Sequence, residues 1–232
     1  MKILSPLKKA IKRIIKKFGY TIHKKNEYKD KWVNVTNAIE HNSQTQIDNF
    51  FKDDSLLTNY INEERIEFYR EVAGLAKEKI FSPGQTVVDA GCGTGHLLYY
   101  LKEKLGFQKA TGLDFSPEAI KIAKKLFPFF DFYEFDIYKG WNGKFDLVFC
   151  TEVLEHLLYP EEALVNLIAM MNENGKILIT VPNGRNDTFG GHINFWSPES
   201  WEVFIKKNTQ GLYTETGSLQ NKNVNYAIIK KS

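Results

Sequence analysis

The chain has 232 residues, a net charge of +3 at pH 7 and 43% hydrophobic residues, enough to build one well-buried α/β core. Its two cysteines, Cys92 and Cys150, are too few for a disulfide framework and favour a reducing compartment. No uncharged run approaches about 18 residues, and the lysine-rich start lacks the apolar block of a secretory signal. The sequence therefore predicts a cytoplasmic protein without a membrane span.

The positive charge is concentrated at the N-terminus. Residues 1–31 hold eleven lysine and arginine residues against two acids, a net charge of +9 that leaves −6 on the remainder. Ser5 and Pro6 form a helix start, after which apolar residues recur at helical spacing and lysines fill the other face. A basic amphipathic helix over residues 5–18 fits peripheral contact with the inner face of a membrane, or packing on its own domain.

The chain divides into an arm and a main domain. Residues 1–45 are interpreted as the basic amphipathic arm, of which residues 20–45 are polar and poorly patterned, as is typical of a linker. Residues 46–232 form the main domain. It opens with a helical lid, because apolar positions recur at three- and four-residue spacing over residues 46–80.

From residue 86 onward, short apolar runs alternate with amphipathic segments. The predicted strands are 86–90, 109–114, 130–136, 145–150 and 175–181, the predicted helices are 95–105, 117–126, 160–172 and 198–207, and two closing antiparallel strands are 211–219 and 223–231. This rhythm predicts an α/β fold with a doubly wound, mainly parallel, seven-stranded Rossmann-like sheet. An antiparallel C-terminal strand pair and an N-terminal helical extension complete it.

A glycine-rich loop joins the first strand to its helix, in the sequence VVDAGCGTGHLL. Gly91, Gly93 and Gly95 permit close approach of a ligand to the backbone, and the helix that follows presents free N–H groups that suit an anion. His96 stands where the dinucleotide fingerprint requires its third glycine, and no GxxxxGK[ST] motif is present. A nicotinamide-dependent oxidoreductase is therefore the weakest interpretation.

Acidic residues stand at the ends of three predicted strands. Asp89 precedes the glycine loop, Asp114 follows Gly91 by 23 residues, and Asp136 with Ile137 ends the third strand. A carboxylate at the position of Asp114 can accept two hydrogen bonds from a ribose diol. At the third strand end, Asp136 can meet the edge of a nucleobase and Ile137 its face. Because open α/β sheets bind ligands at this edge, the pattern predicts a nucleoside site.

Four segments, VVDAGCGTGHLL, GLDFSPEAIKIAK, FDLVFCTEVLEHL and NGKILITVPN, follow in an order that resembles the class I S-adenosylmethionine-dependent methyltransferases. The resemblance covers about residues 85–230 and makes residues 46–232 a methyltransferase domain with its lid. It implies S-adenosylmethionine as the cofactor, with the helix end after the loop facing the methionine carboxylate. The implied cofactor-binding residues are Asp89, Gly91, Gly93, Gly95, Asp114, Phe115, Ser116, Asp136, Ile137 and Thr151.

The stretch TEVLEHLLYP carries Glu152, Glu155 and His156 at spacing i, i+3, i+4, which one helical face presents together, and His192 lies in the connection after the fifth strand. This E-x-x-E-H…H pattern resembles the polyprenyl-benzenoid O-methyltransferases of ubiquinone synthesis and the small-RNA 2′-O-methyltransferases. The resemblance implies a divalent metal such as Mg²⁺ or Mn²⁺, held by these four residues. Without a metal, His156 or His192 is the candidate general base beside Glu155, and a packing role for the histidine is the competing interpretation.

The sequence favours an S-adenosylmethionine-dependent O-methyltransferase that acts on a hydroxyl of a small-molecule, lipid-linked or surface-glycan sugar acceptor. An RNA 2′-O-methyltransferase with the basic arm on phosphates is an alternative, which the acidic body and the amphipathic order of the lysines disfavour. A non-catalytic binding module with the same fold is a second alternative. The intact glycine loop, Asp114 and Asp136 argue against it.

Removal of residues 1–19 tests the membrane interpretation of the N-terminal helix. We expect the shortened protein to bind anionic liposomes more weakly, because the lysine face that meets lipid headgroups is lost. Its affinity for S-adenosylmethionine is expected to be unchanged. Liposome co-sedimentation and calorimetry measure the two quantities, and equal liposome binding by both chains would rule out membrane contact through this helix.

Overall fold

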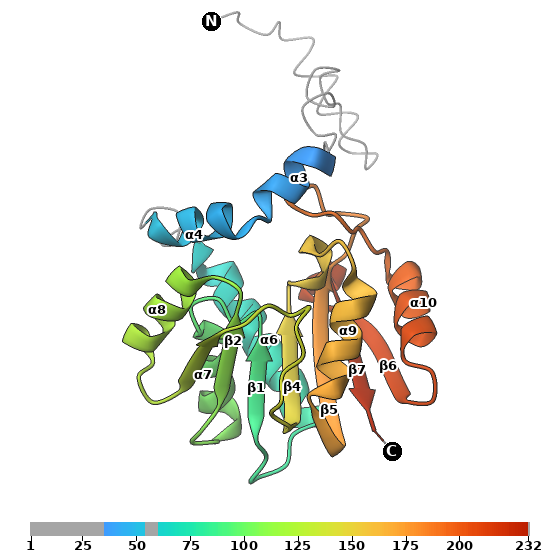
Figure 1. The fold of residues 1–232 in the computed structure, drawn as a ribbon. Coiled ribbons are helices and arrows are strands. Elements are labelled where there is room, and N and C mark those ends of the chain that lie inside the picture. Colours follow the sequence, from blue (N-terminus) through green and yellow to red (C-terminus); the bar gives the residue numbers. More distant parts are fainter. Residues whose placement is uncertain (1–34, 54–59, 232) are drawn as a thin grey trace, which may run out of the picture.

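A computed structural model describes residues 35–53 and 60–231 of the chain (Figure 1). The basic helix predicted over residues 5–18 lies outside these residues, as does most of the predicted arm. Within the described part of the chain, no helix combines the length and apolar composition that crossing a bilayer requires.

A seven-stranded sheet lies at the centre of the fold, with the strand order β3-β2-β1-β4-β5-β7-β6. The strands are β1 (Val87–Ala90), β2 (Thr111–Asp114), β3 (Asp131–Glu134), β4 (Phe145–Thr151), β5 (Met171–Pro182), β6 (Tyr213–Leu219) and β7 (Val224–Lys230). Strands β1 to β5 pair in parallel, whereas β7 is antiparallel to both β5 and β6. The predicted fold class, with its antiparallel C-terminal pair, is confirmed.

Helices cover both faces of this sheet (Figure 1). The described helices are α3 (Val35–His41), α4 (Gln44–Lys52), α6 (Glu63–Lys79), α7 (His96–Leu105), α8 (Pro117–Leu126), α9 (Pro160–Ala169) and α10 (Pro198–Asn208), with short 3₁₀ turns at Leu154–His156 and Gln220–Lys222. Apolar side chains of α6, α7 and α8 form one core cluster that includes Val87. Those of α9 and α10 form a second that includes Val88, because successive residues of a strand point to opposite faces.

Three predicted elements differ from the observed ones. Among the described residues, the segment predicted as helical over 46–80 contains α4 and, separately, α6. Helix α6 begins at its own N-cap, Asn62, whose side chain accepts a hydrogen bond from the Arg65 N–H at 2.9 Å. The linker predicted over residues 20–45 contains helix α3. Helix α9 ends at Ala169, before the predicted residue 172, because Met171 already pairs with Phe145 of β4.

Helices α3 and α4 with their connection, residues 35–52, form a segment that we call the cap. In Figure 1 it lies across the end of the sheet from which the loops after β4 and β5 emerge. Its contacts with the rest of the domain include Lys52 Nζ, 3.9 Å from Glu118 Oε1 of α8, and the Asn42 amide, which donates to the carbonyl of Gly191. The cap therefore stands over the sheet edge at which the sequence places the ligand. The predicted division after residue 45 falls within it.

Candidate active site

The loop after β1 has a backbone that only glycine adopts without strain. Gly91, Gly93 and Gly95 all have positive φ values, of 86°, 50° and 82°. A Cβ atom on Gly91 would lie 2.2 Å from a methyl group of Val153, and one on Gly95 would lie 2.8 Å from the Phe132 ring. The glycines are thus required by the backbone conformation and by close packing, and Gly95 directly precedes helix α7.

Asp114 joins the glycine loop to the end of β2. One of its carboxylate oxygens accepts a hydrogen bond from the Gly93 N–H at 2.7 Å, and the other accepts from the Ser116 N–H at 2.8 Å. Ser116 caps helix α8 by accepting from the Ala119 N–H at 3.1 Å, and its hydroxyl donates to Asp48 of the cap. These contacts hold the Asp114 carboxyl against the glycine loop, and burial raises its pKa.

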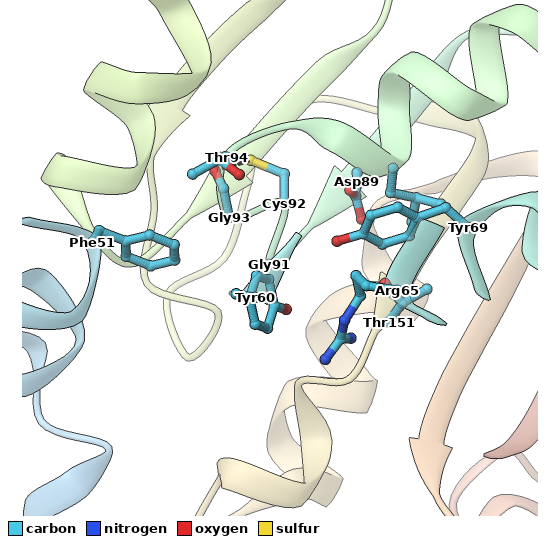
Figure 2. A pocket seen from close by; sticks show the side chains of 11 residues that line it. Phe51, Tyr60, Arg65, Tyr69, Asp89, Gly91, Cys92, Gly93, Thr94 and Thr151 are labelled. Atoms are coloured by element: carbon cyan, nitrogen blue, oxygen red, sulfur yellow. Dashed lines mark hydrogen bonds between the residues drawn. The ribbon is translucent and has the colours of Figure 1, made fainter. Parts of the chain in front are cut away.

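A pocket opens beside the glycine loop (Figure 2). Four predicted residues line it, namely Asp89, Gly91, Gly93 and Thr151, the last at the end of β4. The other lining residues are Phe51, Tyr60, Arg65, Tyr69, Cys92, Thr94 and Leu97. The sequence analysis missed the first four of these because their only signal is helical periodicity, which also describes a packing face.

Six predicted cofactor residues lie outside the lining of this pocket, namely Gly95, Asp114, Phe115, Ser116, Asp136 and Ile137. Phe115 is exposed, and its carbonyl accepts a hydrogen bond from the Gln44 side chain of the cap at 2.9 Å. Asp136 accepts from the Tyr138 N–H at 3.0 Å, in the loop after β3. Ile137 packs in the second core cluster. The pocket is therefore formed by the loop after β1 and by Thr151, and the two predicted residues after β3 do not line it.

Asp89 is buried in this pocket without full hydrogen bonding. It is 1% exposed, and its Oδ1 has no hydrogen-bond partner among the described residues. Burial, and next the charge of Asp114, raises the pKa of Asp89 from 3.8 to about 8. A buried carboxyl in this state lacks a positive partner, which a cationic ligand group would supply.

Arg65 supplies positive charge to the same pocket. Its guanidinium carbon lies 4.4 Å from the centre of the Tyr60 ring and 5.7 Å from that of Phe68. It forms no ion pair with a carboxylate in the part of the chain that the structure describes. Figure 2 shows the guanidinium extending along the pocket wall from α6, beside Thr151. Arg65 is thus placed to meet an anionic ligand group.

A second cluster lies after β4 and β5, where Glu155, His156 and His192 place one potential ligand atom each within 4.8 Å of the others. Glu155 Oε1 lies 4.0 Å from His156 Nε2 and 3.9 Å from His192 Nε2. Glu155 is 1% exposed, and neither of its carboxyl oxygens has a hydrogen-bond partner within residues 35–53 and 60–231. The three side chains therefore point to one small space, but the distances between their facing atoms are too long for hydrogen bonds.

Both imidazole rings are anchored through Nδ1. His192 Nδ1 lies 2.5 Å from Asp187 Oδ2, and His156 Nδ1 lies 3.0 Å from Asn42 Oδ1 and 3.2 Å from the Gly191 carbonyl. These partners only accept hydrogen bonds, so they favour the proton on Nδ1 and leave Nε2 with its lone pair. The sequence analysis missed Asp187 and Asn42 because neither belongs to a motif.

Burial shifts the pKa values of two groups in this cluster. Burial, and next the charge of Glu152, raises the pKa of Glu155 well above its ordinary value. Burial, and next the ring of His192, lowers the pKa of His156 to about 4. Both shifts favour the neutral forms of the two groups, because burial penalises the charged form.

Glu152 does not share one helical face with Glu155 and His156, as its spacing predicted. The backbone of Glu152 is left-handed, with φ of 56°, and only Leu154–His156 form a 3₁₀ turn. Its Oε1 accepts a hydrogen bond from the Thr180 hydroxyl at 3.0 Å, and it lies outside the three-residue cluster. The expected helix is wrong because the chain turns sharply after β4 before it reaches Leu154.

A sequence model described as a methyltransferase domain matches residues 61–208. The chain belongs to this family. The match includes the glycine loop, Arg65, Asp114 and the Glu155–His192 region, whereas Asn42, Phe51 and Tyr60 precede it. The family predicted from the sequence is confirmed at this level.

Curated methyltransferases match about half of the chain. It is 33% identical over 134 residues to the mitochondrial ubiquinone biosynthesis O-methyltransferase of Schizosaccharomyces pombe, covering 54% of this chain and 47% of that protein. It is 26% identical over 137 residues to the ribosomal protein L11 methyltransferase of Thermosipho africanus, covering 56% and 51%. The chain therefore spans about half the length of these relatives, whose acceptors differ in chemistry.

Solved methyltransferase structures share the fold. The N-methyltransferase NodS from Bradyrhizobium japonicum, in complex with S-adenosylhomocysteine, has a TM-score of 0.64 at 18% identity and covers 82% of this chain and 98% of its own. A putative methyltransferase bound to the Haloferax volcanii Trm112 activator has a TM-score of 0.65 at 17% identity, covering 80% and 97%. At these identities the likeness establishes the architecture alone.

Replacement of Asp89 by asparagine is expected to change how stability depends on pH. Because the pKa of Asp89 is about 8, the folded cofactor-free protein keeps a proton between about pH 4 and about pH 8 that the unfolded chain releases. The free energy of unfolding of the natural chain therefore falls as pH rises through this window, by at most about 1.4 kcal/mol per pH unit from this group. Asp89→Asn removes that contribution.

Urea titrations of both chains at about pH 5 and about pH 8 measure the effect. The difference between the two chains isolates Asp89 from other titrating groups, and we expect the stability of Asp89→Asn relative to the natural chain to increase with pH. An identical loss of stability in both chains between the two pH values would contradict the protonated state of Asp89.

Proposed function

We propose that this methyltransferase-family protein transfers a methyl group from S-adenosylmethionine to an oxygen of a small-molecule acceptor. The observation that carries the proposal is the pairing of two half-sites at one sheet edge. One is the pocket beside the glycine loop, with Asp89 and Arg65 in its wall, and the other is the Glu155–His156–His192 cluster. The loops after β1 and β4 that bear them approach each other directly, at Gly91 and Val153.

The first half-site suits the amino-acid end of S-adenosylmethionine. This end carries an ammonium and a carboxylate. The pocket wall contains the Asp89 carboxyl, whose Oδ1 has no hydrogen-bond partner among the described residues, and the Arg65 guanidinium, which forms no ion pair with any of them. The N–H groups at the start of α7 add a positive dipole end near the same position. A carboxyl and a guanidinium in the wall of one pocket are complementary to such a zwitterion.

The ribose fits beside Asp114. Its carboxylate already accepts hydrogen bonds from the N–H groups of Gly93 and Ser116, one on each oxygen. Since a carboxylate has about four acceptor sites, each oxygen keeps one for a ribose hydroxyl. NodS and the plantazolicin methyltransferase BpumL, which share this architecture, hold S-adenosylhomocysteine in their structures. That agreement supports the assignment of the cofactor.

The second half-site suits a divalent metal. The Glu155 carboxyl is buried and unpartnered, and both imidazoles turn an Nε2 lone pair toward it, so a carboxylate and two nitrogens are free to act as ligands. Glu155, His156 and His192 would hold the ion, with Glu152 nearby. A bound ion of this kind supplies Lewis acidity that lowers the pKa of an acceptor hydroxyl. The donor set suits Mn²⁺ better than Mg²⁺, which prefers oxygen ligands.

The chain's own residues then position the reaction. In methyl transfer the acceptor oxygen attacks the methyl carbon, the carbon–sulfur bond breaks in line with it, and the hydroxyl proton leaves to a base. His192 is the best-placed base, because Asp187 orients its ring and leaves Nε2 facing the site. His192 and a metal at this cluster are alternative ways of handling the same proton, and the chelator experiment below separates them.

Aromatic side chains wall the acceptor side. The Phe189 ring centre lies 4.8 Å from that of His192, and the Phe195 ring centre lies 6.3 Å from it on another side. Both phenylalanines are exposed, so their faces are available to a ligand. We infer an acceptor with an apolar or planar portion next to its hydroxyl, which a lipid-linked phenol or sugar satisfies. Membrane contact through residues 5–18 would serve such an acceptor and stays a prediction.

Arg65→Leu is expected to weaken binding of S-adenosylhomocysteine by roughly 10- to 100-fold, because a charge-assisted hydrogen bond to the carboxylate is lost. Calorimetry measures the affinity. Arg70→Leu is the matched control, since Arg70 lies on the same helix with its charged group exposed and paired with Glu67. Equal affinity in the two variants would remove Arg65 from the cofactor site. An absence of binding by the natural chain would remove the cofactor itself.

Glu155→Gln is expected to lower the affinity for Mn²⁺ at least tenfold, because the only buried carboxylate of the cluster is lost. Titration followed by electron paramagnetic resonance measures free Mn²⁺. Glu161→Gln, in the exposed first turn of α9, is the control and is expected to bind as the natural chain does. Methyl transfer is expected to cease after dialysis against a chelator. Full activity in the chelator would discard the metal and leave His192 as the base.

A further inference from the structure

The cap touches the acceptor half of the site through Asn42, which lies between α3 and α4. Its amide nitrogen donates to the Gly191 carbonyl at 2.8 Å, and its Oδ1 lies 3.0 Å from His156 Nδ1. Asn42 and His156 are 114 residues apart in the sequence. A single side chain of the cap thus links the loop after β4 to the loop that carries His192.

The first of these contacts fixes which way the amide of Asn42 points. The Gly191 carbonyl only accepts hydrogen bonds, so the NH₂ group of Asn42 must face it and Oδ1 must face the histidine. The reversed amide would place two acceptors against each other at the Gly191 carbonyl. It would also place the NH₂ group against an Nδ1 that then needs to be an acceptor. The orientation follows from chemistry that is independent of the histidine.

The second contact selects the state of the imidazole. His156 Nδ1 faces two acceptors, Asn42 Oδ1 and the Gly191 carbonyl, the latter at 3.2 Å. A neutral imidazole has one N–H group, and two acceptors at Nδ1 hold the proton there. Nε2, which points to Glu155 Oε1, then carries the lone pair that a metal ligand or a proton acceptor requires.

We propose that Asn42 is a positioning residue that fixes the tautomer of His156 and thereby turns the Nε2 lone pair toward Glu155. The proposal deepens the function proposed above and rests on it for the use to which the lone pair is put. Asn42 touches neither cofactor nor acceptor in this account. It acts through His156, as outer partners of ligating histidines do.

The same segment also touches the cofactor half of the site. The Gln44 side chain donates to the Phe115 carbonyl at 2.9 Å, Asp48 accepts from the Ser116 hydroxyl, and Phe51 lines the pocket beside the glycine loop. Residues 42 to 51 therefore bridge the two half-sites. The Nδ1–H of His156 keeps its shorter contact, to Asn42 Oδ1, only while the cap is docked. The tautomer of His156 therefore depends on the position of the cap, which the contacts on the cofactor side help to hold.

The experiment compares Asn42→Leu with Asn49→Leu in the full, metal-free chain. Asn49 lies on the same segment, on the exposed side of α4, and the chemical change is identical. Nitrogen-15 NMR shifts of His156 report the tautomer directly, and thermal melting confirms that each variant is folded. We expect the natural chain and Asn49→Leu to hold the proton on Nδ1. Asn42→Leu, which keeps only the longer Gly191 contact, is expected to show a mixture of both tautomers.

Asn42→Asp is a second arm, which retains an oxygen acceptor at Nδ1 and is expected to keep the tautomer that Asn42→Leu loses. With Mn²⁺ as probe, Asn42→Leu is expected to bind about tenfold more weakly than Asn49→Leu. An unchanged His156 tautomer in Asn42→Leu would overturn the proposal. If the natural chain binds no Mn²⁺, the metal proposed above fails, and the tautomer measurement still decides the role of Asn42 because it needs neither metal nor methyl transfer.

Discussion

Buried carboxyl oxygens without hydrogen-bond partners are the constraint on which the proposed site depends. Asp89 Oδ1 and both oxygens of Glu155 are enclosed by protein and accept no hydrogen bond within the part of the chain that the structure describes. Leaving such groups unpaired costs on the order of a few kcal/mol each, and a folded domain has only about 5–15 kcal/mol of stability in all. In the function proposed above, ligand groups that pair with these oxygens would recover that cost.

The fold brings the two carboxyl groups to one place through strand order. In the order β3-β2-β1-β4-β5 the first and fourth strands are neighbours, so the chain reverses its direction of winding between them. Crevices form at such switch points because the connections on the two sides diverge. The loops after β1 and β4 nevertheless come so close that a side chain at Gly91 would collide with Val153. Glycine at that position serves the packing of two loops as much as the approach of a ligand.

Family membership accounts for the fold of this chain and its glycine loop but does not identify its acceptor. Membership of the methyltransferase-domain family rests on residues 61–208 and accounts for the sheet, the glycine loop and the acids that follow it. The relatives are named for different acceptors: one is an O-methyltransferase of ubiquinone biosynthesis and the other a methyltransferase of ribosomal protein L11. The proposal for the acceptor side rests instead on the contacts around Glu155, where His156 and His192 are held by Asn42 and Asp187.

Local patterns in the sequence determined the strands, most helices and the glycine loop, because alternating apolar runs and glycines at strand ends act over a few residues. The resemblance to a known family pattern grouped Glu152 with Glu155, His156 and His192. Tertiary structure alone decided that Glu152 stands apart, since a left-handed residue after β4 breaks the helical spacing. It alone brought Arg65 to the pocket and Asn42 to His156. Those contacts join elements far apart in the chain, and no short-range pattern encodes how the cap and α6 dock against the sheet.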